Sequence, residues 1–146
     1  MKISIFALVM SIFLQTLCAD STHLQTQEFP KKEFQKQKKE IARMVAQEIS
    51  KTLPQKIDKY TTLSAITSKD ATLIYTFDIN SGAKSDEAII KEDHSRMQRA
   101  VTKGVCQSSR KFLEAGINTR YIYRSAKSKK ELFVFNITQD TCLHLK

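Results

Sequence analysis

The fold is decided by residues 86–142, which read DEAIIKEDHSRMQRAVTKGVCQSSRKFLEAGINTRYIYRSAKSKKELFVFNITQDTC. This stretch contains one long helical pattern followed by two strand patterns. A cysteine lies in the helical part, Cys106, and another follows the last strand, Cys142. We expect these two cysteines to be joined and the rest of the domain to pack around what they connect.

The helical pattern runs from residue 86 to residue 115. Ser85 can cap its start, and two acidic residues in the first turn suit the helix dipole. An apolar stripe recurs at steps of three, four or seven, and it comprises Ile90, Met97, Val101, Val105 and Phe112. Gly116 is typical of a helix end. Because the pattern is longer than most helices of globular proteins, we expect a bend or break near Gly104.

Alternating apolar and polar residues predict two hairpins. The second consists of residues 118–123 and 132–138, joined by a lysine-rich turn. The first has its clearest strand at residues 72–79, TLIYTFDI, with a shorter partner at 63–67.

A first helix is predicted between Pro30, which suits an initial turn, and Pro54, which ends it. Its apolar positions at helical spacing are Phe34, Ile41, Met44, Val45 and Ile49, with Ala42 and Ala46 beside them. The element order is therefore helix, two strands, helix, two strands. The predicted fold class is α+β, with an antiparallel sheet of three or four strands and two helices packed on one face.

The N-terminus has the layout of a secretory signal peptide over residues 1–19: a basic start, an apolar run from Ile3 to Leu14, and a short polar end. The run is shorter than the roughly 20 residues of a membrane span, so an uncleaved anchor is the minority interpretation. Cleavage after Ala19 is favoured. Cys18 leaves open a lipoprotein anchored through that cysteine, although the bulky Leu17 precedes it. Residues 20–30 are predicted to be a flexible leader and residues 31–146 a single domain.

Export has a consequence for the cysteines. With residues 1–19 removed, Cys106 and Cys142 remain, and an even number in an oxidising compartment favours a disulfide. The bridge would close a loop of about 37 residues, worth about 4 kcal/mol in the chain-entropy model. The alternative is a pair of unpaired buried thiols.

Reaction chemistry is thinly represented. The histidines are His23, His94 and His144, and only His94 stands beside an acidic residue and an apolar stripe. It could act as a base or ligand, but no second group is spaced to assist it, so a surface role is favoured. The cysteines lack zinc spacing, and three glycines offer no phosphate loop. We therefore expect that the protein has no enzymatic activity and binds no cofactor and no metal. The alternative is a small secreted hydrolase or nuclease that uses His94.

The formal net charge of +9 is the strongest compositional signal. It suits an acidic protein surface, an anionic lipid surface or nucleic acid, although export weakens the nucleic-acid interpretation. The charge could also serve solubility alone. Candidate contact residues are Lys31, Lys32, Lys36, Lys38 and Lys39 in the first helix, and Arg124, Lys127, Lys129 and Lys130 in the last turn.

Residues 53–58 (LPQKID), 61–63 (TTL) and 73–77 (LIYTF) form a pattern that continues with Cys106, Gly116, Tyr121, Tyr123 and Cys142. This pattern resembles one in small uncharacterised bacterial periplasmic proteins. The resemblance implies an exported bacterial protein with the helix-to-C-terminus disulfide, and it implies no catalytic residues.

Taken together, the sequence favours an exported, non-catalytic binding or assembly protein of the periplasm. Such a protein could be an accessory part of an envelope or secretion machine, or an inhibitor or immunity protein. Its partner would be another envelope or secreted protein, contacted through an exposed sheet face or the basic helix. A basic module that binds anionic membrane or nucleic acid is the remaining alternative.

Overall fold

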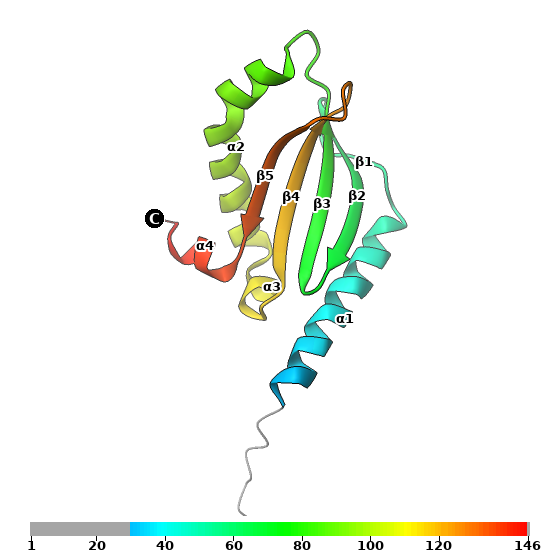
Figure 1. Ribbon diagram of the computed structural model, residues 1–146, viewed down its shortest axis with the longest axis vertical. Coiled ribbons are helices and arrows are strands. Elements are labelled where there is room, and N and C mark those ends of the chain that lie inside the picture. Colours follow the sequence, from blue (N-terminus) through cyan, green and yellow to red (C-terminus); the bar gives the residue numbers. More distant parts are fainter. Residues whose placement is uncertain (1–29, 146) are drawn as a thin grey trace, which may run out of the picture.

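A five-stranded sheet in the order β1-β2-β3-β4-β5 organises residues 30–145, the part of the chain that this computed structural model describes (Figure 1). The elements are α1 (Lys31–Ser50), β1 (Gln55–Lys56), β2 (Thr61–Lys69), β3 (Thr72–Ile79), α2 (Asp86–Ser108), α3 (Arg110–Glu114), β4 (Asn118–Ser125), β5 (Glu131–Ile137) and α4 (Gln139–Leu143). The predicted α+β class is confirmed. The predicted signal peptide, and the leader up to residue 29, lie outside the described residues.

The sheet is mixed, whereas the sequence predicted three or four antiparallel strands. The β2–β3 and β4–β5 hairpins are antiparallel as expected, but β3 and β4 pair in parallel, from Thr72 opposite Asn118 to Ile79 opposite Ser125. The cause is α2, which returns the chain from the C-terminal end of β3 to the side of the sheet where β3 begins. The strand β4 therefore starts there and runs in the same direction as β3. A crossover of this kind joins parallel strands. The fifth strand, β1, contains only two residues and lies between the first helix and the first predicted hairpin, where no strand was predicted.

Both long helices cover the same face of the sheet, as predicted. In α1, Ala42 and Ala46 pack against Ile66 and Leu73 of the central hairpin. Ile89 of α2 belongs to a second cluster, which includes Phe77, Tyr123, Phe133 and Phe135. Figure 1 shows α1 beside β2 and α2 beside β5, at opposite edges of the sheet.

The residues that α1 buries differ from the larger ones named from its periodicity. Ala42 and Ala46 are buried, whereas Phe34, Ile41 and Met44 are 48%, 39% and 50% exposed. Small side chains allow the helix backbone to approach the sheet closely, so the alanines form the contact and the larger residues flank it. Val45 and Ile49 are half-buried, as their place beside this contact requires.

The long helical pattern is interrupted at Ser109, five residues after the predicted position. Gly104 lies inside α2 with open space around it, so the helix continues through it and does not use the conformational freedom of glycine. Ser109 leaves the helical region with φ −112° and ψ 15°, and α3 continues to the turn at Gly116. Gly116 has φ +75°, a left-handed conformation that suits glycine at a helix end.

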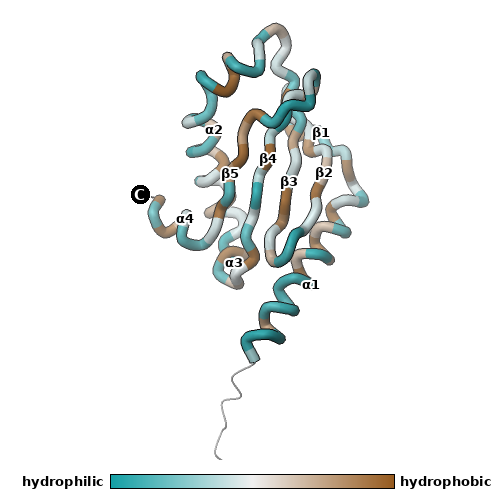
Figure 2. Tube along the Cα trace, viewed as in Figure 1, coloured by the Kyte–Doolittle hydropathy of each residue, from teal (hydrophilic) through white to brown (hydrophobic). Residues whose placement is uncertain are grey.

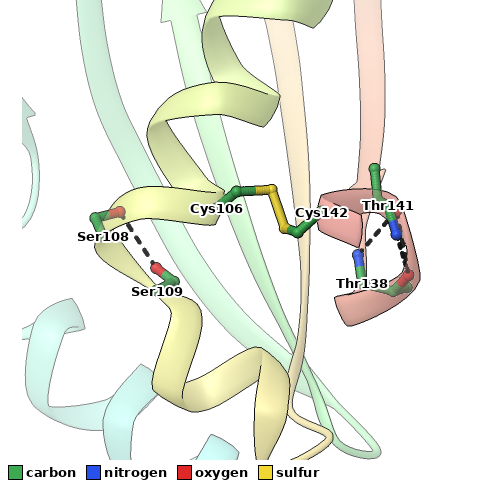
Figure 3. Close-up of a disulfide and its surroundings, with 6 residues drawn as sticks. All are labelled: Cys106, Ser108, Ser109, Thr138, Thr141 and Cys142. Atoms are coloured by element: carbon green, nitrogen blue, oxygen red, sulfur yellow. Dashed lines mark hydrogen bonds between the residues drawn. A yellow bond between two sulfur atoms is a disulfide. The ribbon is translucent and has the colours of Figure 1, made fainter. Parts of the chain in front are cut away.

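A disulfide joins Cys106 of α2 to Cys142 of α4, which is the pairing that the sequence predicted (Figure 3). The short helix α4 was not predicted. It begins at Thr138, whose hydroxyl accepts a hydrogen bond from the backbone N–H of Thr141 while the Thr141 hydroxyl accepts one from the N–H of Thr138. The bridge therefore fastens the last helix against the end of α2, and Val105, Leu113 and Ile137 are buried around it.

Candidate functional site

The central strands carry a row of stacked aromatic rings on the face that bears the helices. The parallel register places Tyr75 opposite Tyr121 and Phe77 opposite Tyr123. Ring centroids are 4.9 Å apart for Tyr75–Tyr121, 5.7 Å for Phe77–Tyr121 and 4.8 Å for Phe77–Tyr123. We call this row, together with the side of α1 that borders it, the interhelical face.

Neither helix fully covers this row. The contacts of α1 are mainly with β2, and those of α2 are mainly with β5. Tyr75 and Tyr121 are consequently half-buried, whereas Phe77 and Tyr123 beside them are buried. Within residues 30–145, no side-chain hydrogen bond engages the hydroxyls of the three tyrosines. The sheet therefore presents apolar rings with polar tips that a partner could engage.

These tyrosines remain neutral over the physiological range. Burial raises the pKa of Tyr75, and burial, together with the negative charge of Asp58, raises the pKa of Tyr123 to about 12. The pKa of Tyr121 is raised further, by burial first and then by its two tyrosine neighbours. We call the row of Tyr75, Phe77, Tyr121 and Tyr123 the floor of the interhelical face; this floor is thus uncharged.

One side of α1 borders the floor, and two lysines show which side it is. Lys39 pairs with Asp70 in the β2–β3 turn, with Nζ 2.8 Å from Oδ1. Lys38 points the other way and lies against Gly116 at the start of β4, where an added Cβ would be 2.8 Å from its Nζ. Residues three, four or seven positions apart share a helix side, so Ile41 and Val45 lie on the side of Lys38. Ile41 is therefore an exposed apolar residue on the side of α1 where Val45 packs against the same core cluster as Tyr75.

The floor continues into a hollow under the start of α2. This hollow has a volume of about 460 Å³. Ile79, Ile89, Met97 and Phe133 form its apolar lining, and Tyr60 stands among the polar residues at its rim. Since Phe133 also contacts Tyr123, the hollow and the interhelical face share one aromatic cluster.

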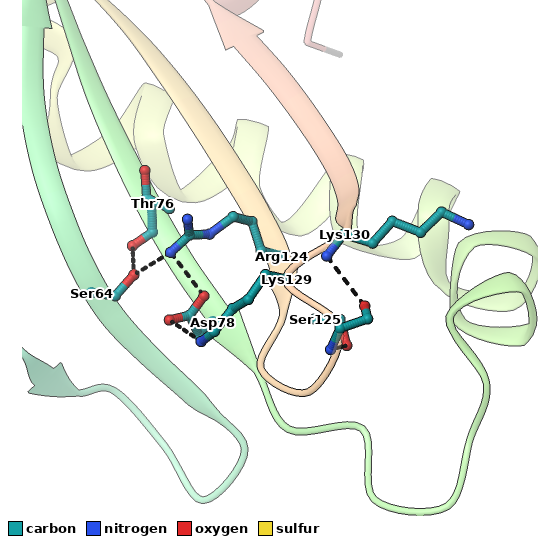
Figure 4. Close-up of polar contacts among 8 residues, drawn as sticks. Ser64, Thr76, Asp78, Arg124, Ser125, Lys129 and Lys130 are labelled. Atoms are coloured by element: carbon teal, nitrogen blue, oxygen red, sulfur yellow. Dashed lines mark hydrogen bonds and ion pairs between the residues drawn. The ribbon is translucent and has the colours of Figure 1, made fainter.

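The opposite face of the sheet has a different chemistry (Figure 4). There Arg124 pairs with Asp78, with Nη2 3.1 Å from Oδ1, and Lys129 approaches the other oxygen of Asp78 at 3.4 Å. Ser64 donates to the carbonyl of Thr76 at 3.1 Å and accepts from Arg124 at 3.4 Å. Arg124 and Lys129, two of the predicted contact residues, are thus paired with the carboxylate of Asp78 in their own chain.

The structure separates the predicted basic contacts into two groups at opposite ends of the sheet. Lys32, Lys36 and Lys39 lie on α1 near the start of β3, whereas Arg124, Lys127, Lys129 and Lys130 lie where β4 ends. Lys130 pairs with Glu87 of α2 at 2.8 Å, and Lys127 is exposed. The two groups cannot form one basic patch, because the full length of the central strands lies between them.

His94 is exposed on α2, with its ring 5.8 Å and 5.6 Å from the rings of Phe133 and Phe135. The neighbouring Asp93 pairs with Arg96 at 2.7 Å. No hydrogen bond or ion pair among residues 30–145 involves His94, and the same residues contain no cluster of three or more His, Cys, Asp or Glu that could hold a metal ion. None of the described helices is long and apolar enough to cross a membrane.

The fold and its surfaces define an α+β domain whose most conspicuous feature is an aromatic surface bordered by two helices. The chain belongs to the family described as "Domain of unknown function (DUF8479)", whose model matches residues 36–133. No curated protein matches the sequence.

Solved structures of other proteins share this fold. A Pseudomonas aeruginosa protein, PA3611, described as secreted, is 16% identical with a TM-score of 0.66, and the match covers 75% of this chain and 96% of that one. EpsS, the pilotin of the Vibrio vulnificus type 2 secretion system, is 18% identical with a TM-score of 0.61, covering 76% and 96%. AspS, the Vibrio cholerae type II pilotin, is 20% identical with a TM-score of 0.59, covering 77% and 98%.

Proposed function

We propose that this protein is an exported, non-catalytic accessory protein of the bacterial envelope that binds another envelope protein through its interhelical face. The observation that carries the proposal is the half-buried pair Tyr75 and Tyr121, whose rings stack on the helix-bearing face, with the exposed Ile41 on the adjoining side of α1. Aromatic residues supply much of the binding energy in protein interfaces, particularly where polar tips can still form hydrogen bonds.

The shape of this surface indicates the kind of partner segment. An uncharged aromatic floor suits the apolar side of an amphipathic segment, and the tyrosine hydroxyls offer hydrogen bonds to its polar edge. The likeness to the two Vibrio pilotins supports an accessory role beside a secretion machine. An inhibitor or immunity role would use the same face, and the identity of the captured partner distinguishes the two.

The cellular location belongs to the same proposal. The signal-peptide pattern of residues 1–19, the resemblance to small periplasmic proteins and the disulfide between Cys106 and Cys142 all support the periplasm. Lipidation at Cys18 would instead hold the same domain at a membrane surface.

Site-specific photo-crosslinking in the native bacterium tests the proposal. A photoreactive phenylalanine analogue replaces Tyr121 on the floor or Ile41 at its border. The matched control carries the analogue at Asn136, which is exposed in β5 and pairs with Arg120 on the opposite face of the sheet. We expect the first two positions to crosslink to the same envelope protein and the control to give no such product.

A substitution then tests whether the interhelical face contributes binding energy to the contact with the partner. Ile41→Asp places a charge beside the floor while leaving the buried Ala42 and Ala46 contact intact, so the domain should fold normally by circular dichroism. Loss of the Tyr121 crosslink in this variant is the expected result. Crosslinks that form equally from Asn136, or that survive Ile41→Asp in a folded protein, would refute the interhelical face as the binding surface.

A further inference from the structure

The N-terminal half of α1 projects beyond the sheet and is mostly hydrophilic (Figures 1 and 2). The β2–β3 turn lies beside it, because Lys39 pairs with Asp70. We call residues 31–39 and 69–71 the basic pole. It contains the lysines Lys31, Lys32, Lys36, Lys38, Lys39 and Lys69 and only two carboxylates, Glu33 and Asp70.

The charge of this pole is left uncompensated by the fold. Within residues 30–145, Lys39 is the only lysine of the pole that forms an ion pair. At the other end of the sheet, Lys84, Lys129 and Lys130 are each paired with a carboxylate of the same chain. With six lysines and two carboxylates, the pole therefore carries a net charge of +4 at the end where the chain enters the described domain.

We infer that the basic pole rests on a membrane surface of anionic phospholipid. Charge complementarity is the first argument, since clustered lysines are attracted to anionic headgroups. Phe34 is the second: the residue is 48% exposed, and Nζ of Lys38 lies 4.9 Å from the centroid of its ring. Helices that lie at a lipid interface combine lysines on one face with aromatic or aliphatic residues on the other, where an exposed ring enters the headgroup boundary.

The direction of the chain agrees with this orientation. Residues 1–29 join the domain at Pro30, next to the pole. Any membrane attachment in that segment, including the lipid that the sequence leaves open at Cys18, would hold this end towards the bilayer. The interhelical face lies over the sheet beyond the pole and would remain accessible to a protein partner, so the inference does not depend on the proposed function.

Vesicle co-sedimentation tests the inference with the chain from Asp20 to Lys146, which contains every described residue but lacks the apolar run of the signal peptide. The probes are vesicles of phosphatidylcholine alone and of phosphatidylcholine with phosphatidylglycerol in equal parts. The test variant is Lys31→Gln, Lys32→Gln, Lys36→Gln. Glutamine and lysine have similar helix propensity, so α1 should remain folded.

The matched control removes the same charge elsewhere. Lys56→Gln, Lys91→Gln, Lys127→Gln changes three exposed lysines that form no ion pair within residues 30–145 and lie outside the basic pole. Each lysine near an anionic surface is worth roughly a fivefold change in binding, so the pole variant should bind phosphatidylglycerol vesicles on the order of 100-fold less tightly. The control should lose far less, and the wild-type affinity should fall steeply between low and high salt.

Three results would overturn the inference. One is equal binding to vesicles with and without phosphatidylglycerol. Another is an equal loss of binding in the two triple variants, which would assign the effect to net charge alone. The third is binding to a duplex oligonucleotide at the same salt without binding to vesicles, which would assign the pole to nucleic acid. Crosslinking through Tyr121 is measured separately, so failure here leaves the proposed function standing.

Discussion

Removal of the disulfide should cost the domain a large part of its stability. The test variant is Cys106→Ala, Cys142→Ala, which removes the bond and leaves no free thiol. The cysteines are 36 positions apart in sequence, and closing a loop of that length lowers the entropy of the unfolded chain by an amount worth about 4 kcal/mol. Since small domains are typically stable by about 5–15 kcal/mol, the variant should fold but be marginal.

Urea unfolding followed by circular dichroism measures this loss. With a denaturant slope near 2 kcal/mol per molar, the midpoint should fall by about 2 M, and the slope itself should rise because the unlinked chain exposes more surface. Reduced wild-type protein should unfold like the variant, and the variant should be insensitive to reductant. A free energy of unfolding within about 1 kcal/mol of the oxidised wild type would refute the reasoning, since the bridge would then constrain little.

The other predictions concern the core, one turn and alkaline pH. Leu73→Ala removes a side chain that is 2% exposed, so the free energy of unfolding should fall by about 3 kcal/mol; a loss below about 1 kcal/mol would contradict the packing. Gly116→Ala places a Cβ at φ +75° and 2.8 Å from Nζ of Lys38. This variant should lose about 1 kcal/mol of unfolding free energy and have a lower thermal midpoint. Gly104→Ala, in open space inside α2, should not lower the midpoint. Because folding raises the pKa of Tyr123 from 10.0 to about 12, its contribution to stability should be complete below pH 10 and lost as the pH rises through 12. The tyrosinate absorbance of Tyr123, measured as the difference between the wild type and Tyr123→Phe, should accordingly appear together with unfolding.

Local patterns predicted the elements well, because each depends on residues close together in the chain. The alternation of residues 72–79 and the Ser85 cap both identify elements that the structure contains, and the Ser85 hydroxyl does accept from the N–H of Ala88. The disulfide pairing followed from the cysteine count after export. The parallel pairing of β3 with β4 did not follow, because it depends on how α2 crosses the sheet, which no local pattern encodes.

The candidate surface was harder to predict than the fold. Helical periodicity identified Ile41 as part of the buried stripe, yet periodicity cannot show whether a helix approaches through its large residues or through Ala42 and Ala46. The signal that could have indicated the floor is the alternation of Tyr75, Phe77, Tyr121 and Tyr123 on two strands. That alternation predicts strands but not partly exposed rings, since the exposure of the rings depends on the spacing of the two helices.

The position of β5 at the edge of the sheet has a consequence for the protein before its disulfide has formed. Its residues 132–137, LFVFNI, contain no charge, glycine or proline, which is the composition of segments that stack into cross-β assemblies. The helix that follows this strand directly is the one that the Cys106–Cys142 bond secures. Because the bond holds in place the segment that follows β5, we expect the reduced protein to self-associate more readily than the oxidised protein.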